Sequence, residues 1–213
     1  MNIWAIVPVK PLKRSKSRLS SVLTTQQRET LSRQMLEQTL LTLKQVKGIE
    51  GVLIISRDAG ALALGRKLEA QTLTESGSPE LNASLTRATR VVASWNGSGV
   101  LIVASDIPLL QAADIEGMLA LAKGPAPVVV IASDRRREGT NALLVRPPGL
   151  FPYRFGEGSF KKHIDEAEKA GAVVKVFQSG TLGLDVDLPA DLDLYRELLA
   201  ERSAGEAAWY TGI

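Results

Sequence analysis

Short apolar runs alternate along this chain with longer segments in which apolar residues recur at helical spacing. Apolar runs of about four to eight residues between turn residues are typical of buried strands, and a period near 3.6 residues is typical of covering helices. The pattern predicts strands at 3–9, 51–56, 72–74, 100–104, 128–131, 142–145 and 173–177. It predicts one helix from 25 to a stop at Gly48, and further helices at 82–95 and 112–122. It also predicts a helix that ends at 68, one that ends at 170 and one that begins at 189.

Strands that alternate with helices predict an α/β fold, a Rossmann-like three-layer α/β/α sandwich around a mostly parallel sheet. The runs 128–131 and 142–145 flank a polar turn, which predicts an antiparallel addition to that sheet. With 213 residues, 45% of them hydrophobic and 23% charged, the chain fits a single domain over 1–213. Its tail from about Arg202 lacks clear periodicity, so docking, a homodimer contact and disorder remain open for it.

Two scarcities restrict the chemistry. The chain has no cysteine and one histidine, His163, which excludes thiolate zinc sites, cysteine nucleophiles and multi-histidine metal centres. Any metal would be held by oxygen ligands, which favours Mg²⁺, or Mn²⁺, bound by one or two carboxylates and by the phosphates of a ligand. His163 follows two lysines near the start of a basic helix, and we interpret it as a surface side chain rather than a general base.

Charge and hydropathy also limit the partners. The net charge is only +3, so we expect no broad basic face for nucleic acid. No apolar stretch approaches the roughly 20 residues of a membrane span, and the first apolar run lacks the flanks of a signal peptide. We therefore expect a cytoplasmic protein that binds small phosphorylated ligands.

Basic residues follow the first predicted strand directly. They are Lys10, Lys13, Arg14, Lys16 and Arg18. In open α/β sheets, ligands bind outside the carboxyl ends of the strands. Lysine supplies a point charge there and arginine a bidentate donor, so the segment predicts an anion site, with a solvated loop as the alternative. The spacing excludes a Walker A loop.

Aspartates follow two further apolar segments. Asp106 comes directly after the run 100–104, so we expect its carboxylate at the same sheet edge, with turn or capping duty as the alternative. Asp185 and Asp187 alternate about Val186, and on a strand both would face the same side. A bound cation would relieve their repulsion, as would exposure at a sheet edge. One of this pair with Asp106 would make a two-carboxylate magnesium site, whereas Asp191 fits a helix cap.

Two other motifs could hold a ligand. Thr140 and Asn141 offer hydrogen bonds, although Gly-Thr-Asn also suits an ordinary turn. Gly156, Gly158 and Ser159 precede a predicted helix, whose unpaired backbone amides can bind phosphate or carboxylate. Ser159 could equally be only the N-cap of that helix.

In combination, these motifs resemble those of the guanylyltransferases of deazaflavin coenzyme F-420 biosynthesis, which join GTP to 2-phospholactate, phosphoenolpyruvate or a related phosphoacid. The matching stretches are Val7-Pro8-Val9-Lys10 with Lys16-Ser17-Arg18-Leu19, Leu81-Asn82, Asp106-Ile107-Pro108, Gly139-Thr140-Asn141-Ala142-Leu143, Phe155-Gly156 with Ser159, and Asp185-Val186-Asp187-Leu188-Pro189. They span nearly the whole chain in order. The opening motif combined with Gly-Thr-Asn is the specific part.

The resemblance implies a GT-A-like nucleotidyltransferase fold and a role for each motif. The nucleotide would contact Lys10, Lys16, Arg18 and, near the nucleoside, Asn82. Lys16 and Asp106 would be catalytic, Asp106 and Asp187 would bind Mg²⁺, and Thr140, Gly156 and Ser159 would hold the phosphoacid.

The implied reaction suits the composition. An anionic phosphate oxygen of the acid would attack the α-phosphorus of GTP and expel pyrophosphate, so no catalytic base is needed. Phosphoenolpyruvate, 2-phospho-L-lactate and 3-phosphoglycerate remain open as acceptors. The alternatives are nucleotidyl transfer to a sugar phosphate or molybdopterin, and a non-catalytic module that binds nucleotide or RNA. The small number of aromatic residues argues against RNA binding by base stacking.

Overall fold

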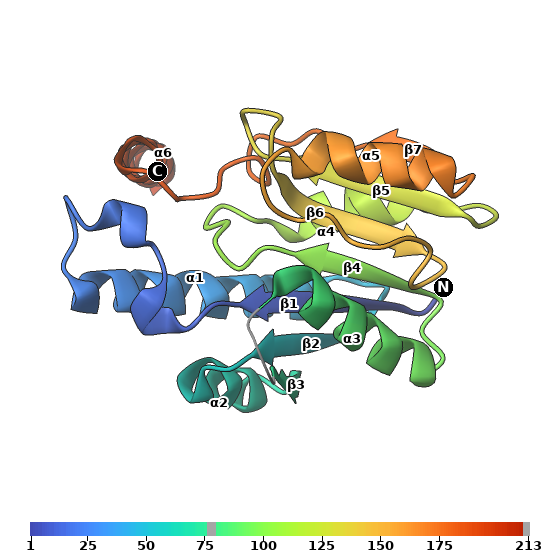
Figure 1. Ribbon diagram of the computed structural model, residues 1–213. Helices are drawn as coiled ribbons and strands as arrows, with labels where there is room; N and C mark the ends of the chain where they lie inside the picture. Colours follow the sequence, from blue (N-terminus) through green and yellow to red (C-terminus); the bar gives the residue numbers. More distant parts are fainter. Residues whose placement is uncertain (76–79, 211–213) are drawn as a thin grey trace.

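A twisted seven-stranded sheet forms the centre of the molecule, with the strand order β3-β2-β1-β4-β6-β5-β7 (Figure 1). The computed structural model describes residues 1–75 and 80–210, except for the side chains of 202–210. The strands are β1 (Ile3–Val9), β2 (Ile49–Ser56), β3 (Gln71–Thr74), β4 (Gly99–Val103), β5 (Val128–Ser133), β6 (Thr140–Arg146) and β7 (Val173–Val176). All the predicted strands are present, with ends that differ by a few residues.

Strand β6 runs against its neighbours. It pairs antiparallel with both β4 and β5, whereas the pairs β1–β2, β1–β4, β2–β3 and β5–β7 are parallel. This confirms the predicted antiparallel addition. Because Val103 at the end of β4 pairs with Ala142 near the start of β6, the first residues of β6 lie at the edge where the parallel strands end.

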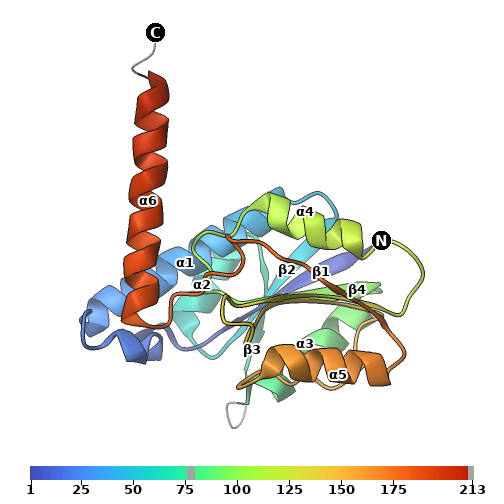
Figure 2. The same ribbon diagram turned by 90° about the horizontal axis from the view of Figure 1, so that it is seen from above.

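Helices cover both faces of the sheet and confirm the three-layer prediction (Figure 2). They are α1 (Thr25–Gln45), α2 (Ala59–Lys67), α3 (Leu81–Ser94), α4 (Ala112–Leu121), α5 (Ser159–Lys169) and α6 (Pro189–Tyr210). Helices α1, α2 and α4 pack on one face, and α3 and α5 pack on the other. Strand β1 supplies both layers, because Ala5 and Val7 face the first and Ile6 the second.

The first residues of the helices explain their starts. Thr24 and Gln27 form a capping box before α1, the side chain of each accepting a hydrogen bond from the backbone N–H of the other. Asp58 caps α2 through the N–H of Ala61, and Pro189 opens α6 at the position that proline favours. No helix within the described ranges is long and apolar enough to cross a bilayer.

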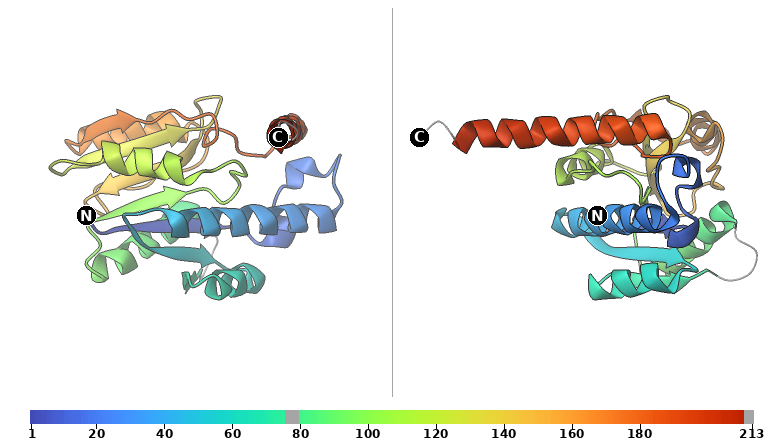
Figure 3. Two further views of the ribbon diagram at one scale, coloured as in Figure 1. Left: turned by 180° about the vertical axis from the view of Figure 1, so that it is seen from behind. Right: turned by 90° about the vertical axis from the view of Figure 1, so that its left-hand side faces the viewer.

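Helix α6 extends away from the sheet, as two further views show (Figure 3). Its first turns pack through Leu192 and Tyr195 against Leu19, Met35 and Val186. The backbone of the tail from about Arg202 continues this helix to Tyr210. The predicted docking or homodimer role of the tail concerns side chains outside the described part, and it stays a prediction.

Candidate active site

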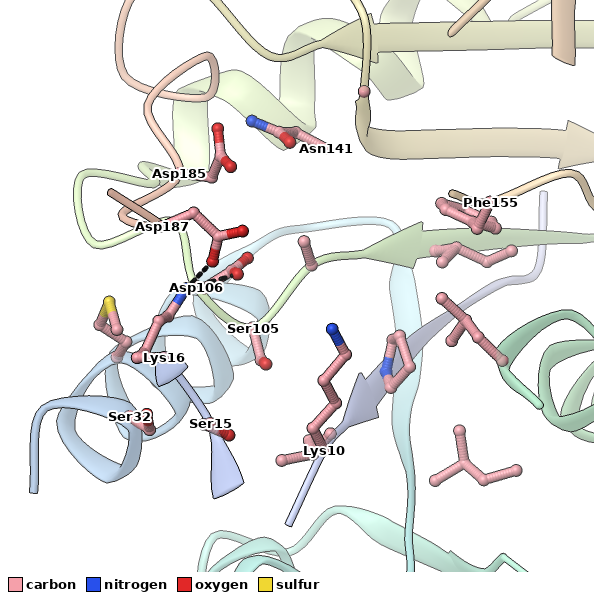
Figure 4. A pocket seen from close by; sticks show the side chains of 18 of the residues that line it. Lys10, Ser15, Lys16, Ser32, Ser105, Asp106, Asn141, Phe155, Asp185 and Asp187 are labelled. Atoms are coloured by element: carbon pink, nitrogen blue, oxygen red, sulfur yellow. Dashed lines mark hydrogen bonds and ion pairs between the residues drawn. The ribbon is translucent and has the colours of Figure 1, made fainter. Parts of the chain in front are cut away.

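A cavity of about 570 Å³ opens at the sheet edge where β1, β2 and β4 end and β6 begins. It gathers most of the predicted site residues. Those that line it are Lys10, Lys16, Asp106, Thr140, Gly156, Ser159 and Asp187, together with Asp185 and Asn141. Figure 4 labels the lysines, the aspartates and Asn141 among them. Arg18 and Asn82 are not among its lining residues.

The basic segment after β1 is a folded loop with its own anchors. It forms two short 3₁₀ turns, Leu12–Arg14 and Ser17–Leu19, whose side chains Leu12 and Leu19 are buried. The Leu12 N–H donates to the Asp58 carboxylate at 2.9 Å, which joins the loop to the start of α2. Lys16 lies between the turns with a φ of +56°, a left-handed conformation that is uncommon outside glycine. These anchors hold the Lys16 side chain toward the cavity.

Lys16 sits between two aspartates from distant parts of the chain. Its Nζ lies 2.6 Å from Oδ2 of Asp106 and 3.1 Å from Oδ1 of Asp187, and its side chain is only 5% exposed (Figure 4). Burial alone would lower the pKa of Lys16, but the charges of Asp106 and Asp187 outweigh it and raise that pKa. Burial likewise opposes ionisation of Asp187, but Lys16 holds its pKa below the usual range. Lys16 and Asp187 are therefore both charged at neutral pH.

Asp185 and Asp187 lie in a loop and not on a strand. The loop is nevertheless held in place: Val186 is buried, and its N–H donates to the Asp106 carbonyl at 3.2 Å. Both Asp185 and Asp187 line the cavity. Burial, with the nearby charge of Asp106, raises the pKa of Asp185 to about 6. Asp191 caps α6 as predicted, since its carboxylate accepts the N–H of Leu188 at 2.8 Å.

The carboxylates have the donor chemistry that magnesium prefers. Asp106 and Asp187 come close enough to share one ammonium group, and both face the cavity. Within the described ranges, however, no group of three or more acidic, histidine or cysteine side chains is arranged to hold a metal. A two-carboxylate site therefore fits only an ion that takes further oxygens from its ligand.

The other side of the cavity begins at β6 and α5. Thr140 starts β6, and Ser159 is the first residue of α5; both are buried. Gly158 is the N-cap of α5, so Ser159 does not cap it. Gly156 has a φ of +124°, a conformation suited to glycine, and a Cβ built there meets nothing within 4 Å. Asn141 donates to the Leu182 carbonyl at 3.0 Å and so links β6 to the loop of Asp185.

His163 is buried, and the prediction of a surface side chain is wrong. Its ring is 0% exposed and lies edge-on to Phe155, with 4.6 Å between ring centroids. Burial lowers its pKa to about 4. The neighbouring lysines suggested exposure, but Phe160, Ile164 and Ala167 mark the inward face of α5. His163 falls on that face at helical spacing, and this signal could have placed it correctly.

Two residues predicted to contact the nucleotide, Asn82 and Arg18, already have partners within the protein. The Asn82 amide exchanges hydrogen bonds with the Phe155 backbone, at 2.8 Å from its N–H and 3.2 Å to its carbonyl. Arg18 is 70% exposed and lies 3.7 Å from Asp187. The cavity also includes two residues that the sequence did not single out, Arg57 and Glu75, which pair at 3.1 Å beside β2 and β3. No motif marks them; only the shared sheet edge brings them near.

Comparisons with known proteins agree with this arrangement. Solved structures show the fold: a putative nucleotide-diphospho-sugar transferase from Desulfovibrio desulfuricans G20 has a TM-score of 0.71 at 16% identity, covering 92% of this chain and 87% of its own. A CMP:2-keto-3-deoxy-manno-octonic acid synthetase complexed with CTP gives 0.65 at 15% identity, with coverages of 95% and 100%. Both likenesses confirm the nucleotidyltransferase type of α/β fold.

Curated relatives are closer in sequence. The phosphoenolpyruvate guanylyltransferase of Rubrobacter xylanophilus is 38% identical over 192 residues, covering 90% of this chain and 92% of that protein. The 2-phospho-L-lactate guanylyltransferase of Methanothermobacter thermautotrophicus is 36% identical over 192 residues, covering 90% and 83%. The family model described as "Guanylyl transferase CofC like" matches residues 3–203. The chain therefore belongs to the CofC-like guanylyl transferase family.

Proposed function

We propose that this protein transfers the guanylyl group of GTP to a small phosphoacid and releases pyrophosphate, as a step of coenzyme F-420 biosynthesis. Family membership supports the transfer. The observation that carries the proposal is a single cavity in which the Lys16–Asp106–Asp187 cluster lies on one side and Thr140 with Ser159 lies on another. One side suits a polyphosphate, and the other suits a second anion.

The reaction requires two anions to be brought together. A phosphate oxygen of the acid attacks the α-phosphorus of GTP, a new P–O–P bond forms, and the bond to pyrophosphate breaks. The nucleophile is already ionised, so the protein has to align the two ligands and offset their charge. Lys10 and Lys16 line the cavity and can supply positive charge, and Arg18 can reach the phosphates from the rim.

Magnesium is part of the proposal. Asp106 and Asp187 would hold the ion together with phosphate oxygens, and the ion would offset the charge that develops on the triphosphate. In the structure, the Lys16 ammonium already contacts both carboxylates and offsets part of their negative charge. We therefore infer that Lys16 leaves this position when the metal and the nucleotide bind, which frees its charge for the phosphates.

Thr140, Gly156 and Ser159 are proposed to bind the phosphoacid. The hydroxyl groups and the backbone at the start of α5 offer donors to a phosphate or carboxylate. Phosphoenolpyruvate, 2-phospho-L-lactate and 3-phosphoglycerate all carry both groups. Because GTP and these acids are cytoplasmic metabolites, the proposed reaction would take place in the cytoplasm.

Pyrophosphate release tests the proposal. Purified protein is incubated with Mg²⁺, one nucleoside triphosphate and one acceptor, using GTP, ATP, CTP and UTP against the three phosphoacids and a set of sugar phosphates. The expected result is release that requires both GTP and a phosphoacid, with a product whose mass equals the acid plus GMP less water. Turnover with sugar phosphates alone, or nucleotide binding without turnover, would contradict it.

A further inference from the structure

His163 lies behind the proposed phosphoacid site without facing the cavity. It is the sole histidine of the chain, it is fully buried, and it lies one turn after Ser159 in α5. Its Nδ1 lies 3.0 Å from Oγ1 of Thr140, and its Nε2 accepts the backbone N–H of Arg154 at 3.0 Å. Both ring nitrogens therefore have partners.

These partners determine where the imidazole proton lies. A backbone N–H can only donate, so Nε2 must present its lone pair to Arg154. A neutral imidazole carries one proton, which then belongs to Nδ1. That N–H donates to Oγ1 of Thr140, so the hydroxyl oxygen acts as the acceptor in this contact. The proton of the Thr140 hydroxyl is left for another acceptor.

We propose that His163 is the positioning residue of the phosphoacid site, holding the Thr140 hydroxyl so that its proton points to an anionic oxygen of the ligand. The proposal rests on the proposed function of that site. Thr140 lines the cavity, whereas His163 does not. His163 thus acts through Thr140 and does not touch the reacting atoms.

The same ring fixes the segment that leads to Gly156. The Arg154 N–H donates to Nε2, and the Phe155 ring packs edge-on against the imidazole. Ser159 lies four residues before His163 on the same helix, and the two share its inward face. One buried side chain therefore contacts Thr140 and the segment that leads to Gly156, and it lies on the helix that Ser159 begins.

The surroundings keep the imidazole neutral. Phe151 and Phe155 flank the ring, and burial lowers its pKa well below neutrality. A protonated ring would turn Nε2 into a donor facing the Arg154 N–H, which has no acceptor capacity. Because a neutral ring with a fixed tautomer always donates to Oγ1 of Thr140, the proton of the Thr140 hydroxyl points away from the ring.

The first test is a direct observation of the ring. Because the chain has a single histidine, ¹⁵N-labelled histidine gives one imidazole in the NMR spectrum of the whole protein. The expected result at pH 7 is a neutral ring protonated at Nδ1. A ring protonated at Nε2, or a charged ring, would overturn the proposal, whereas the kinetic variants below separate the contact with Thr140 from the structural contact with Arg154.

The second test separates the two hydrogen bonds of the ring. Asparagine places an amide where Nδ1 lies, and glutamine places one near Nε2. His163→Asn therefore keeps a donor to Thr140, and His163→Gln keeps an acceptor for Arg154. We expect His163→Gln to raise the KM for the phosphoacid at least about tenfold, the loss typical of a hydrogen bond to a charged group, and His163→Asn to raise it less. The KM for GTP should move by less than about twofold in both variants.

Substitutions of Thr140 complete the test. Thr140→Val should raise the KM for the phosphoacid as much as His163→Gln does, and Thr140→Ser should retain most of the affinity. The double variant Thr140→Val with His163→Gln should have a KM no higher than either single variant, because both substitutions act through one hydroxyl. Additive losses, or equal losses for the two His163 variants, would overturn the proposal. If the His163 variants do not fold, the Thr140 pair and the NMR spectrum decide it. Absence of turnover by the unaltered protein would contradict the proposed function. Turnover by a protein whose His163 ring is protonated at Nε2 would contradict only the role of His163.

Discussion

Lys16 and Asp106 are 90 positions apart in the sequence, yet Nζ of Lys16 lies 2.6 Å from Oδ2 of Asp106. The two residues follow β1 and β4, which are neighbours in the sheet. An internal cation thus occupies the place beside the carboxylate that we propose as a metal ligand.

Replacement of Asp106 tests that carboxylate. Asp106→Asn keeps the size of the side chain but removes the charge that would bind metal, so we expect kcat/KM to fall at least about 100-fold. The protein should stay folded with a modest fall in the unfolding midpoint, because the buried Lys16 ammonium loses one charged partner but keeps Asp187. Pyrophosphate release and thermal unfolding measure the two effects. Asp193→Asn, on the exposed side of α6, is the matched control. Normal activity with ordinary magnesium dependence would refute the assignment.

Lys16→Met probes the competition between the ammonium and the metal. Without Lys16, Asp106 and Asp187 lose the ammonium that both contact, so Mg²⁺ should stabilise the variant more than the unaltered protein when no nucleotide is present. Catalytic turnover should nevertheless fall at least about 100-fold, because the same lysine is proposed to contact the phosphates. Thermal unfolding across a magnesium titration measures the first effect. Lys47→Met is the control, and equal magnesium shifts in all three proteins would argue against the competition.

Gly156 and Gly171 form a matched pair. Both have positive φ, at +124° and +71°, and a Cβ at either meets nothing within 4 Å. Alanine should therefore destabilise the protein at both positions, by about 1–3 kcal/mol. Only Gly156 lines the cavity, so only Gly156→Ala should also raise the KM for the phosphoacid. Urea unfolding and steady-state kinetics measure the two effects. Similar kinetics for the two variants would remove Gly156 from the site.

Replacement of Asn82 distinguishes a contact with the nucleoside from a structural contact with the Phe155 backbone. Its hydrogen bonds to the Phe155 backbone predict that Asn82→Ala loosens the segment before Gly156, raising the KM for the phosphoacid and lowering the free energy of unfolding by about 1–2 kcal/mol. The nucleoside contact implied by the resemblance predicts instead a higher KM for GTP. The ratio of the two KM changes decides between them, and a change confined to GTP would favour the nucleoside contact.

The buried imidazole should make stability depend on pH. In the folded protein the pKa of His163 is lowered from 6.5 to about 4. The unfolded chain therefore binds a proton first as the pH falls, and stability is lost between about pH 6.5 and pH 4. Relative to His163→Gln, the unaltered protein should lose about 2 kcal/mol between pH 7.5 and pH 5. Urea unfolding of both proteins at these pH values measures the difference. A constant difference would mean that the histidine is not buried in its neutral form.

The positions of the strands along the chain were predictable because apolar runs identify buried segments directly, whereas their order in the sheet comes from the structure alone. Asp106 was placed correctly for the same reason, since the end of a strand locates the residue that follows it. The position of Lys16 between Asp106 and Asp187 was not predictable, because it depends on contacts across 90 and 171 residues. His163 was misjudged because the charge of adjacent lysines was weighed above its helical face. The hydrogen bonds between Asn82 and the Phe155 backbone were not predictable, because contacts with a distant part of the chain leave no local pattern.

The reversed strand β6 has a consequence for how this enzyme type can diversify. The cationic loop and Asp106 come from the first half of the sheet, whereas Thr140 and α5 come after the reversal. On the proposed function, the acceptor side is encoded by one contiguous stretch, 140–169, and the polyphosphate side by segments before and after it. A change of acceptor would then call for substitutions within that stretch that keep the hydrogen bond from Asn141 to the Leu182 carbonyl, which joins the two sides.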